Sequence, residues 1–160
     1  MEATVEYVEK TPKHNSAVSE IIKTWGSDII VTRGIKYSAK DLEGILVYDN
    51  EKIIGLGLYN IADKDCEIIL LETFVQNKGI GTQILEKIKE IARSKKCNRI
   101  WLITTNDNID SMKFYQRRGF HFSNIYVNGF EVTRKIKGEE PELGNYDIPI
   151  RDEIEFEMTI

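Results

Sequence analysis

The sequence predicts one mixed α/β domain, and three observations favour this class. The chain has 160 residues, of which 41% are hydrophobic, which suits a single domain over residues 1–160 with one sizeable core. Short apolar runs of strand length recur through its first half. Residues 67–75 then lead directly into a glycine-containing loop, residues 76–82, which opens an amphipathic helix. Strands and helices are therefore expected to share one core.

The N-terminal segment predicts a strand followed by a helix. Residues 4–8 alternate as a short strand. Asn15 or Ser16 can cap the helix, and Gly26 can end it. The apolar residues between them recur at helical spacing: Val18, Ile21, Ile22 and Trp25. This helix is expected to lie over the sheet.

The next segment predicts an antiparallel meander. Residues 29–32 are either a small strand or a buried connector, and residues 38–41 lie in a polar turn. Residues 45–48 and 53–59 form a predicted hairpin around an Asp-Asn-Glu turn, and residues 66–75 extend it by one strand.

Alternating helices and strands are expected in the second half. A helix follows the glycine loop, because apolar residues recur there at helical spacing: Ile80, Ile84, Leu85, Ile88, Ile91 and Ala92. Residues 99–105 form a predicted strand, which a further helix follows. Residues 122–127 and 154–160 are predicted strands, and residues 135–149 an exposed loop rich in turn residues.

The glycine loop is suited to an anion. A helix start presents unpaired backbone N–H groups, which attract phosphate. Gly79 and Gly81 allow close approach of the backbone, and Lys78 adds a cation. Two better-known phosphate loops do not fit, because the Walker Gly-Lys-Ser/Thr run is absent and Ile84 stands where the dinucleotide fingerprint needs a third glycine.

Two motifs together resemble the GNAT superfamily of N-acetyltransferases. Gln76-x-x-Gly79-x-Gly81 is similar to its Q/RxxGxG/A motif, and the block from Asn108 to Phe120 is similar to its NxxAxxFYxxxGF block, with Ser111 in place of alanine. The resemblance is strongest over residues 45–122. It implies a central mixed, mostly antiparallel sheet flanked by helices, in which the parallel strands ending at residues 75 and 105 splay apart.

The resemblance also implies a cofactor and the residues that bind it. The loop would hold the pyrophosphate of acetyl-CoA, and the pantetheine arm would enter between the splayed strands. No metal is expected, because the sequence has no CxxC or His/Cys cluster. The implied cofactor-binding residues are Phe74, Val75, Gln76, Asn77, Lys78, Gly79, Ile80, Gly81, Thr82, Asn108 and Ser111.

Three residues are candidates for catalysis. By resemblance, Tyr115 protonates the departing CoA thiolate, and the alternative is an aromatic side chain that only packs on its helix. A backbone N–H near Thr73 or Phe74 would stabilise the oxyanion. Glu72 or Glu67 could take the proton of the amine, unless both are ordinary solvated or structural carboxylates. Their odd spacing places them on opposite faces of a regular strand, which a bulge could change.

Charge and composition narrow the classes of partner. A net charge of −4 argues against nucleic acid. The C-terminal end is rich in carboxylates, which favours a cationic amine acceptor; the alternative is an ordinary solvated surface. The chain has no apolar signal core or membrane-length window, so we expect a cytoplasmic protein without a membrane partner. Cys66 and Cys97 are expected to be reduced thiols, and His14 and His121 have no ligand-like spacing.

The predicted function is transfer of an acetyl group from acetyl-CoA to a primary amine of a small molecule or peptide, by direct attack in a ternary complex. A competing class is a catalytically weak acetyl-CoA-binding module with a regulatory or interaction role. A different acyl group or an alcohol acceptor is a third alternative. A homodimer through the late strands is a further expectation by resemblance.

Overall fold

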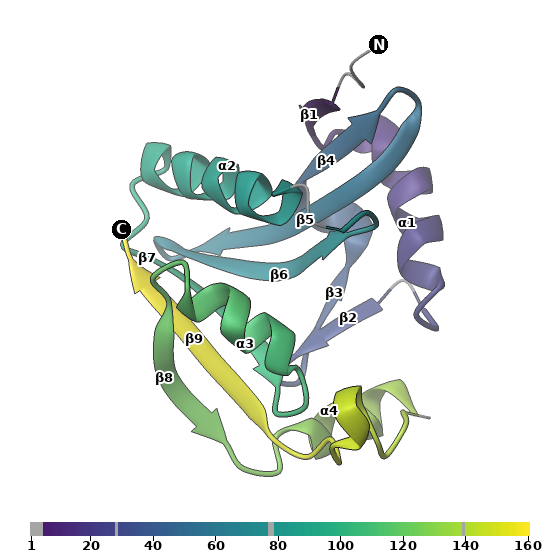
Figure 1. The fold of residues 1–160 in the computed structure, drawn as a ribbon, viewed down its shortest axis with the longest axis vertical. Coiled ribbons are helices and arrows are strands. Elements are labelled where there is room, and N and C mark those ends of the chain that lie inside the picture. Colours follow the sequence, from purple (N-terminus) through teal and green to yellow (C-terminus); the bar gives the residue numbers. More distant parts are fainter. Residues whose placement is uncertain (1–4, 28, 77–78, 139) are drawn as a thin grey trace.

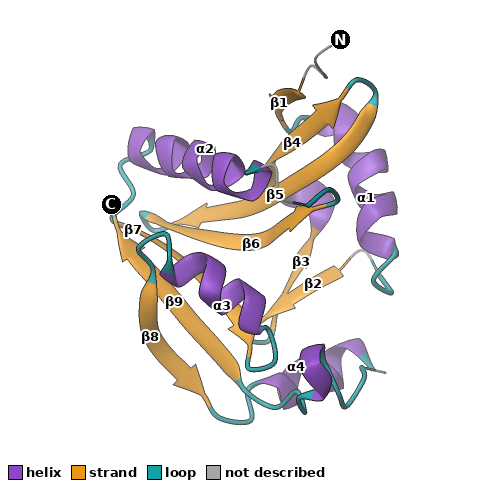
Figure 2. Cartoon of the chain, viewed as in Figure 1, coloured by secondary structure: helices purple, strands orange, loops and turns teal. Residues whose placement is uncertain are grey.

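The computed structural model describes residues 5–27, 29–76, 79–138 and 140–160. Its main sheet has seven strands in the order β1-β4-β5-β6-β7-β9-β8. Helices lie around this sheet, and its two halves open away from each other (Figure 1, Figure 2). A separate hairpin of two strands stands beside it.

The N-terminal half of the sheet is the predicted meander. It comprises β1 (Val5–Glu9), β4 (Glu43–Asp49), β5 (Lys52–Ala62) and β6 (Asp65–Thr73), all paired antiparallel. Asn50 has a positive φ of 56° at the turn between β4 and β5, a conformation that asparagine adopts more readily than most residues. The predicted hairpin at residues 45–59 is therefore confirmed.

Helices cover the two faces of this half. The helix α1 (Asn15–Lys23) buries Val18 and Ile22 in one apolar cluster. The helix α2 (Ile80–Ser94) packs on the opposite face, in a second and larger cluster. Its axis lies close to β5 because Gly57 leaves room there: a methyl group on Gly57 would overlap Ile84 of α2.

The C-terminal half of the sheet is reached by crossover. The strand β7 (Arg99–Thr105) runs parallel to β6, and β8 (His121–Tyr126) and β9 (Glu153–Thr159) complete the sheet. The last strand, β9, lies between β7 and β8 and pairs antiparallel with both. The helix α3 (Ile109–Gln116) covers the same face as α2, since Tyr115 joins the cluster that α2 buries.

Two segments differ from the sequence prediction. Residues 29–32 are indeed a strand, β2 (Ile29–Thr32). It pairs with a strand that was not predicted, β3 (Ile35–Ser38), and a short 3-10 turn follows β3. The helix α4 (Phe130–Lys137) includes the start of the predicted loop at residues 135–149. Phe130 and Thr133, one helical turn apart, are buried, and Gly138 ends the helix with a positive φ of 87°. No helix in the described part of the chain has the length and hydropathy that a membrane span requires.

Candidate active site

The parallel strands β6 and β7 separate toward their carboxyl ends. Their pairing runs from Asp65 with Arg99 to Ile68 with Leu102. Beyond Ile68, the described part of the sheet has no further pairing between these strands. A cavity of about 120 Å³, here called the strand cleft, opens at this level. The predicted splay is therefore present, and main-chain groups of both strands border it.

A bulge in β6 sets the direction of its two glutamates. The register with β5 shifts so that Ile69 has no partner there. Glu67 pairs with Asn60 and Glu72 with Leu56, and these two β5 residues lie on the same face because they are four apart. Both carboxylates therefore project from the same face of β6. A regular strand would have placed them on opposite faces.

Backbone donors of β6 also face the strand cleft. The N–H of Phe74 donates to the carbonyl of Ile54 in β5, at 2.8 Å. Successive N–H groups of a strand point to opposite sides, so the N–H groups of Leu71 and Thr73 point toward β7. Of the two predicted oxyanion donors, Phe74 is therefore already used, and Thr73 retains the required direction together with Leu71.

Tyr115 places its phenol beside the strand cleft. The residue lines this cavity and is 6% exposed. Its ring makes edge contacts with Phe114 and Phe120, at centroid distances of 5.0 and 5.3 Å. Among the described residues, its hydroxyl has no hydrogen-bond partner. Burial, followed by the nearby charge of Glu72, raises the pKa of this phenol, so Tyr115 is protonated at neutral pH.

The two candidate carboxylates have different environments. Glu72 lines the strand cleft and is exposed, yet partial desolvation by surrounding residues raises its pKa. Glu67 is 4% exposed and accepts hydrogen bonds from Thr32 at 2.8 Å and Tyr37 at 3.1 Å. Burial raises the pKa of Glu67 even though these bonds lower it. Among the described residues Glu72 has no hydrogen-bond partner, whereas Glu67 is held by the β2–β3 hairpin.

The glycine loop leads from this cleft into α2. Gly79 caps α2 with a left-handed φ of 67°, so glycine suits this position. A Cβ on Gly81 would lie 3.4 Å from the ring of Phe114, which shows how closely the helix start approaches α3. The side chain of Ile80 is buried, so only its main chain can meet a ligand. Val75 packs on the core, while Phe74 and Gln76 are exposed; Asn77 and Lys78 lie outside the described residues.

Asn108 and Ser111 stand where the strand cleft meets α3. Both line the cavity, and the side chain of Asn108 caps α3 by accepting a hydrogen bond from the backbone N–H of Ser111, at 3.3 Å. This bond uses the amide oxygen. Within the described structure the amide nitrogen has no partner, so its two donors remain available.

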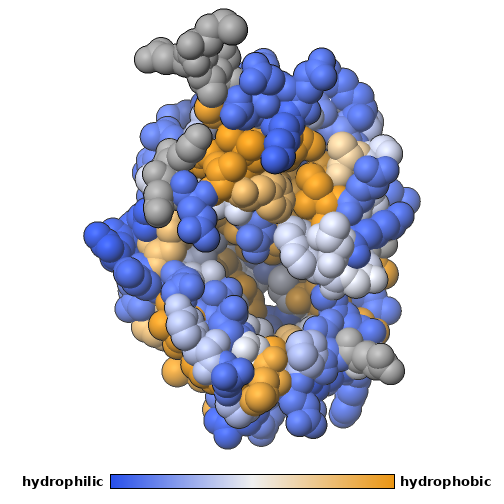
Figure 3. Space-filling view, turned by 45° about the vertical axis from the view of Figure 1, so that its right-hand side comes forward, coloured by the Kyte–Doolittle hydropathy of each residue, from blue (hydrophilic) through white to orange (hydrophobic). Residues whose placement is uncertain are grey.

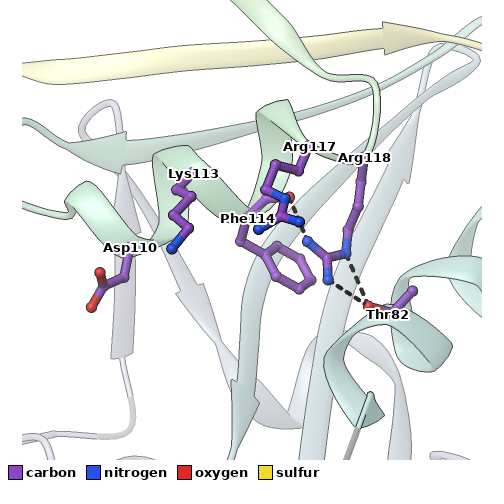
Figure 4. Close-up of a pocket in the computed structure, with 6 residues that line it drawn as sticks. All are labelled: Thr82, Asp110, Lys113, Phe114, Arg117 and Arg118. Carbon is purple, nitrogen blue, oxygen red and sulfur yellow. Dashed lines mark hydrogen bonds between the residues drawn. The ribbon is translucent and has the colours of Figure 1, made fainter. Parts of the chain in front are cut away.

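The sequence motifs did not reveal a group of cations at the far end of α3. Arg118 donates from Nε and one terminal nitrogen to the hydroxyl of Thr82, at 2.9 and 2.8 Å, and its guanidinium lies 3.7 Å over the ring of Phe114 (Figure 4). Lys113 and Arg117 are exposed beside it. The Arg-Arg pair directly before Gly119 was the signal that could have identified this group.

The face of the sheet opposite α2 and α3 carries buried carboxylates. Glu153 and Glu155 of β9 share this face with Glu67, as the strand register shows. Glu155 accepts a hydrogen bond from Tyr126, and the guanidinium of Arg33 lies 3.9 Å over the ring of Tyr126. Burial raises the pKa of Glu153.

The molecule is visibly hollowed near the centre of the face shown in Figure 3.

Comparison with known proteins gives a consistent family. The model of the acetyltransferase (GNAT) family matches residues 12–120. The uncharacterized protein YdhI of Bacillus subtilis (strain 168) is 43% identical over 140 residues, which cover 86% of this chain and 87% of that protein. The spermine/spermidine N(1)-acetyltransferase of the same strain is 31% identical over 102 residues, 56% of this chain and 66% of that protein.

A solved structure has the same fold. The GNAT family acetyltransferase from Elizabethkingia anophelis, with acetyl-CoA bound, superposes with a TM-score of 0.71 at 22% identity, over 100% of both chains. The splayed strands, the glycine loop and the matched family model agree, and the chain belongs to the acetyltransferase (GNAT) family.

Proposed function

We propose that this protein is an N-acetyltransferase, which moves an acetyl group from acetyl-CoA to a primary amine within a ternary complex. The observation that carries the proposal is the strand cleft, where the phenol of Tyr115 and the carboxylate of Glu72 line one cavity and neither has a hydrogen-bond partner among the described residues. An acid and a base on either side of a gap between strands suit acyl transfer, because one proton must leave the amine and one must reach the thiolate.

The residues of the cleft fit acetyl-CoA. Backbone N–H groups of Leu71 and Thr73 face the gap, where they can pair with an extended amide-containing chain. The amide nitrogen of Asn108, which has no partner among the described residues, can donate hydrogen bonds to the same chain. Bound acetyl-CoA supplies the activated acetyl thioester. A preorganised N–H in a dry cleft stabilises the negative charge that develops on a carbonyl oxygen during acyl transfer.

Tyr115 serves as the acid. Its raised pKa keeps the proton on the phenol until the thiolate departs. A phenol with an ordinary pKa near 10 is a weaker acid than a thiol with a pKa near 8.5. Burial beside Tyr115 also raises the pKa of the CoA thiol, because it disfavours the charged thiolate. Proton transfer between these two groups is therefore feasible in the cleft.

Glu72 serves as the base. A general base is most efficient when its pKa lies near the working pH, and the raised pKa of Glu72 is a shift in this direction. Glu72 can act directly or through a water molecule. Glu67 is the alternative base, but its two hydrogen bonds to the β2–β3 hairpin favour a positioning role.

The acceptor is proposed to be a cationic amine, and a polyamine in particular. Buried carboxylates on the face of the sheet opposite α2 and α3 provide a negative environment: Glu67, Glu153 and Glu155. The relative that is 31% identical carries the name spermine/spermidine N(1)-acetyltransferase. Both observations support an acceptor with more than one positive charge.

A panel of amines tests this proposal. CoA thiol release from acetyl-CoA is measured with spermidine, spermine, a lysine-containing peptide and a neutral monoamine analogue. We expect the highest kcat/KM with the polyamines. Transfer only to neutral or acidic amines would contradict a cationic acceptor, and tight CoA binding without transfer to any amine would favour a binding module instead.

A further inference from the structure

The turn of the β2–β3 hairpin carries an arginine in an unusual position. Arg33 and Gly34 are its two central residues, with φ values of 48° and 76°. Turns with two positive φ values favour Asn-Gly or Gly-Gly, because larger side chains meet steric strain in this conformation. The turn itself gives no reason for an arginine, so the contacts of the side chain must account for it.

The side chain of Arg33 lies on an aromatic ring beside a buried carboxylate. The carbon of its guanidinium is 3.9 Å from the centroid of the Tyr126 ring. The backbone N–H of Arg33 donates to Oε2 of Glu153 at 3.2 Å. Among the described residues, no carboxylate oxygen lies within 4 Å of the guanidinium nitrogens. The guanidinium is therefore held by the ring face and not by an ion pair.

A cavity of about 170 Å³, here called the hairpin cavity, adjoins this contact. The hairpin forms one wall and α4 another, because β2 contacts α4 (Figure 1) and a Cβ on Gly34 would lie 3.2 Å from the side chain of Val132. Arg33 is exposed, so its side chain can leave the cavity for solvent while the fold stays unchanged. The residues that line the cavity are Arg33, Tyr126, Gly129, Val132 and Glu153.

The positive charge of Arg33 compensates buried negative charge. Glu67 and Glu153 are both buried below the hairpin. Burial raises the pKa of each carboxyl group, and the nearby charge of Arg33 opposes this shift in both. A buried carboxylate without a compensating charge is costly. If the guanidinium leaves the cavity, another cation should therefore take its place.

The hairpin cavity lies close to the strand cleft. Glu153 of β9 pairs with Thr105 of β7, and the preceding residue, Thr104, lines the cleft. From the spacing of neighbouring strands, the backbone of Glu153 is roughly 6 Å from that of Thr104. Spermidine and spermine carry a second ammonium group a few methylene groups from the primary amine, which is a comparable length. A polyamine whose primary amine meets the acetyl group in the cleft thus places its next charge at the hairpin cavity.

We propose that the hairpin cavity binds the second cation of the acceptor, and that Arg33 occupies this place until the acceptor displaces it. The inference rests on the proposed function, since it takes a polyamine as the acceptor. The ammonium group takes over the face of Tyr126 and the field of Glu153, and the guanidinium moves into solvent. The exchange keeps the buried carboxylates compensated before and after binding. Arg33 is then a specificity-determining residue that competes with the second charge of the acceptor.

Steady-state kinetics with spermidine and with butylamine, which carries a single charge, test the inference. The wild type is compared at saturating acetyl-CoA with Arg33→Gln, which removes the competing charge, and with Arg33→Lys, which keeps one. Lys36→Gln is the control, because Lys36 is an exposed cation of the same hairpin that does not line the cavity. Thermal unfolding of each variant verifies that it folds.

Arg33→Gln should raise kcat/KM for spermidine on the order of fivefold, because the cation–π contact is no longer contested, and should raise that for butylamine much less. Arg33→Lys should show a smaller gain, and Lys36→Gln should match the wild type. An unchanged or lower kcat/KM for spermidine in Arg33→Gln, or an equal gain with both amines, would overturn the inference while the proposed function stands. Failure of the wild type to acetylate any amine of the panel would overturn the proposed function itself.

Discussion

Replacement of Tyr115 by phenylalanine should separate catalysis from folding and binding. The phenol hydroxyl has no hydrogen-bond partner among the described residues, and the ring contacts with Phe114 and Phe120 do not involve it. No protein hydrogen bond is lost, so the free energy of unfolding should change by less than about 1 kcal/mol. The affinity for CoA should also change little.

Turnover should respond very differently. A positioned general acid contributes roughly 10²- to 10⁴-fold to the rate. Loss of the hydroxyl should therefore raise the activation barrier by about 3 to 5 kcal/mol. The predicted signature is a large decrease in kcat, with an almost unchanged dissociation constant for CoA and an almost unchanged midpoint of thermal unfolding.

The assay follows CoA thiol release under saturating acetyl-CoA and amine, beside calorimetry with CoA and a thermal melt. Tyr48→Phe is the matched control, because Tyr48 is partly buried on β4 and does not line the strand cleft. Its kcat should equal that of the wild type. A Tyr115→Phe enzyme whose kcat stays within about twofold of the wild type would refute the acid role, since general acids contribute far more.

Three further predictions concern packing, pH and the phosphate loop. In Gly57→Ala the added methyl group should overlap Ile84 and lower the free energy of unfolding by about 2 kcal/mol, which lowers the unfolding midpoint by roughly 4–8 °C. An unchanged midpoint would mean that α2 is not packed this tightly. Burial raises the pKa of Glu67, so the carboxyl group holds its proton more strongly in the native than in the unfolded protein. The free energy of unfolding of the wild type, relative to that of Glu67→Gln, should therefore fall as the pH rises from about 4.5 through the raised pKa. A difference in unfolding midpoint between the two proteins that does not fall over this range would contradict this. Gly81→Glu should weaken CoA binding on the order of tenfold, because it places a carboxylate at the helix start. Gly81→Ala should bind nearly normally, because the added Cβ stays 3.4 Å from Phe114; equal affinities of the two variants would argue against phosphate binding there.

The sequence predicted those elements whose periodicity is strong and local. The meander from β4 to β6 and the helix α2 follow from apolar spacing and turn residues alone. The short helix α4 escaped prediction because only Phe130 and Thr133 are buried in its eight residues, too few to mark a helical face. The strand β3 escaped because its exposed Ile35 and half-buried Tyr37 alternate with polar residues in a segment of only four.

Long-range arrangement was beyond local patterns. The position of β9 between β7 and β8 depends on tertiary pairing, and only the family resemblance implied a sheet with splayed parallel strands. No pattern in the sequence marks the bulge at Ile69, yet this bulge places Glu67 and Glu72 on the same face. Whether Glu72 rather than Glu67 is free depends on Thr32 and Tyr37, which lie more than 25 residues away in the chain.

The candidate site was identified through motifs, and the structure refined it. Asn108 and Tyr115 came from the resemblance, and the structure brings both to the strand cleft. The expectation for Phe74 as an oxyanion donor was wrong, because its N–H pairs with β5. Lys113 and Arg117 were missed because isolated charges on a helix are normally solvated, and only the folded structure places them beside Arg118.

The most direct measurement of the central claim is mass spectrometry of spermidine incubated with the protein and acetyl-CoA carrying a labelled acetyl group. Transfer by the wild type, with N-acetylspermidine formed in equal amount to free CoA and almost none formed by Tyr115→Phe, is the predicted result. CoA binding by calorimetry without labelled product from spermidine or any other amine of the panel would contradict the assignment of an N-acetyltransferase.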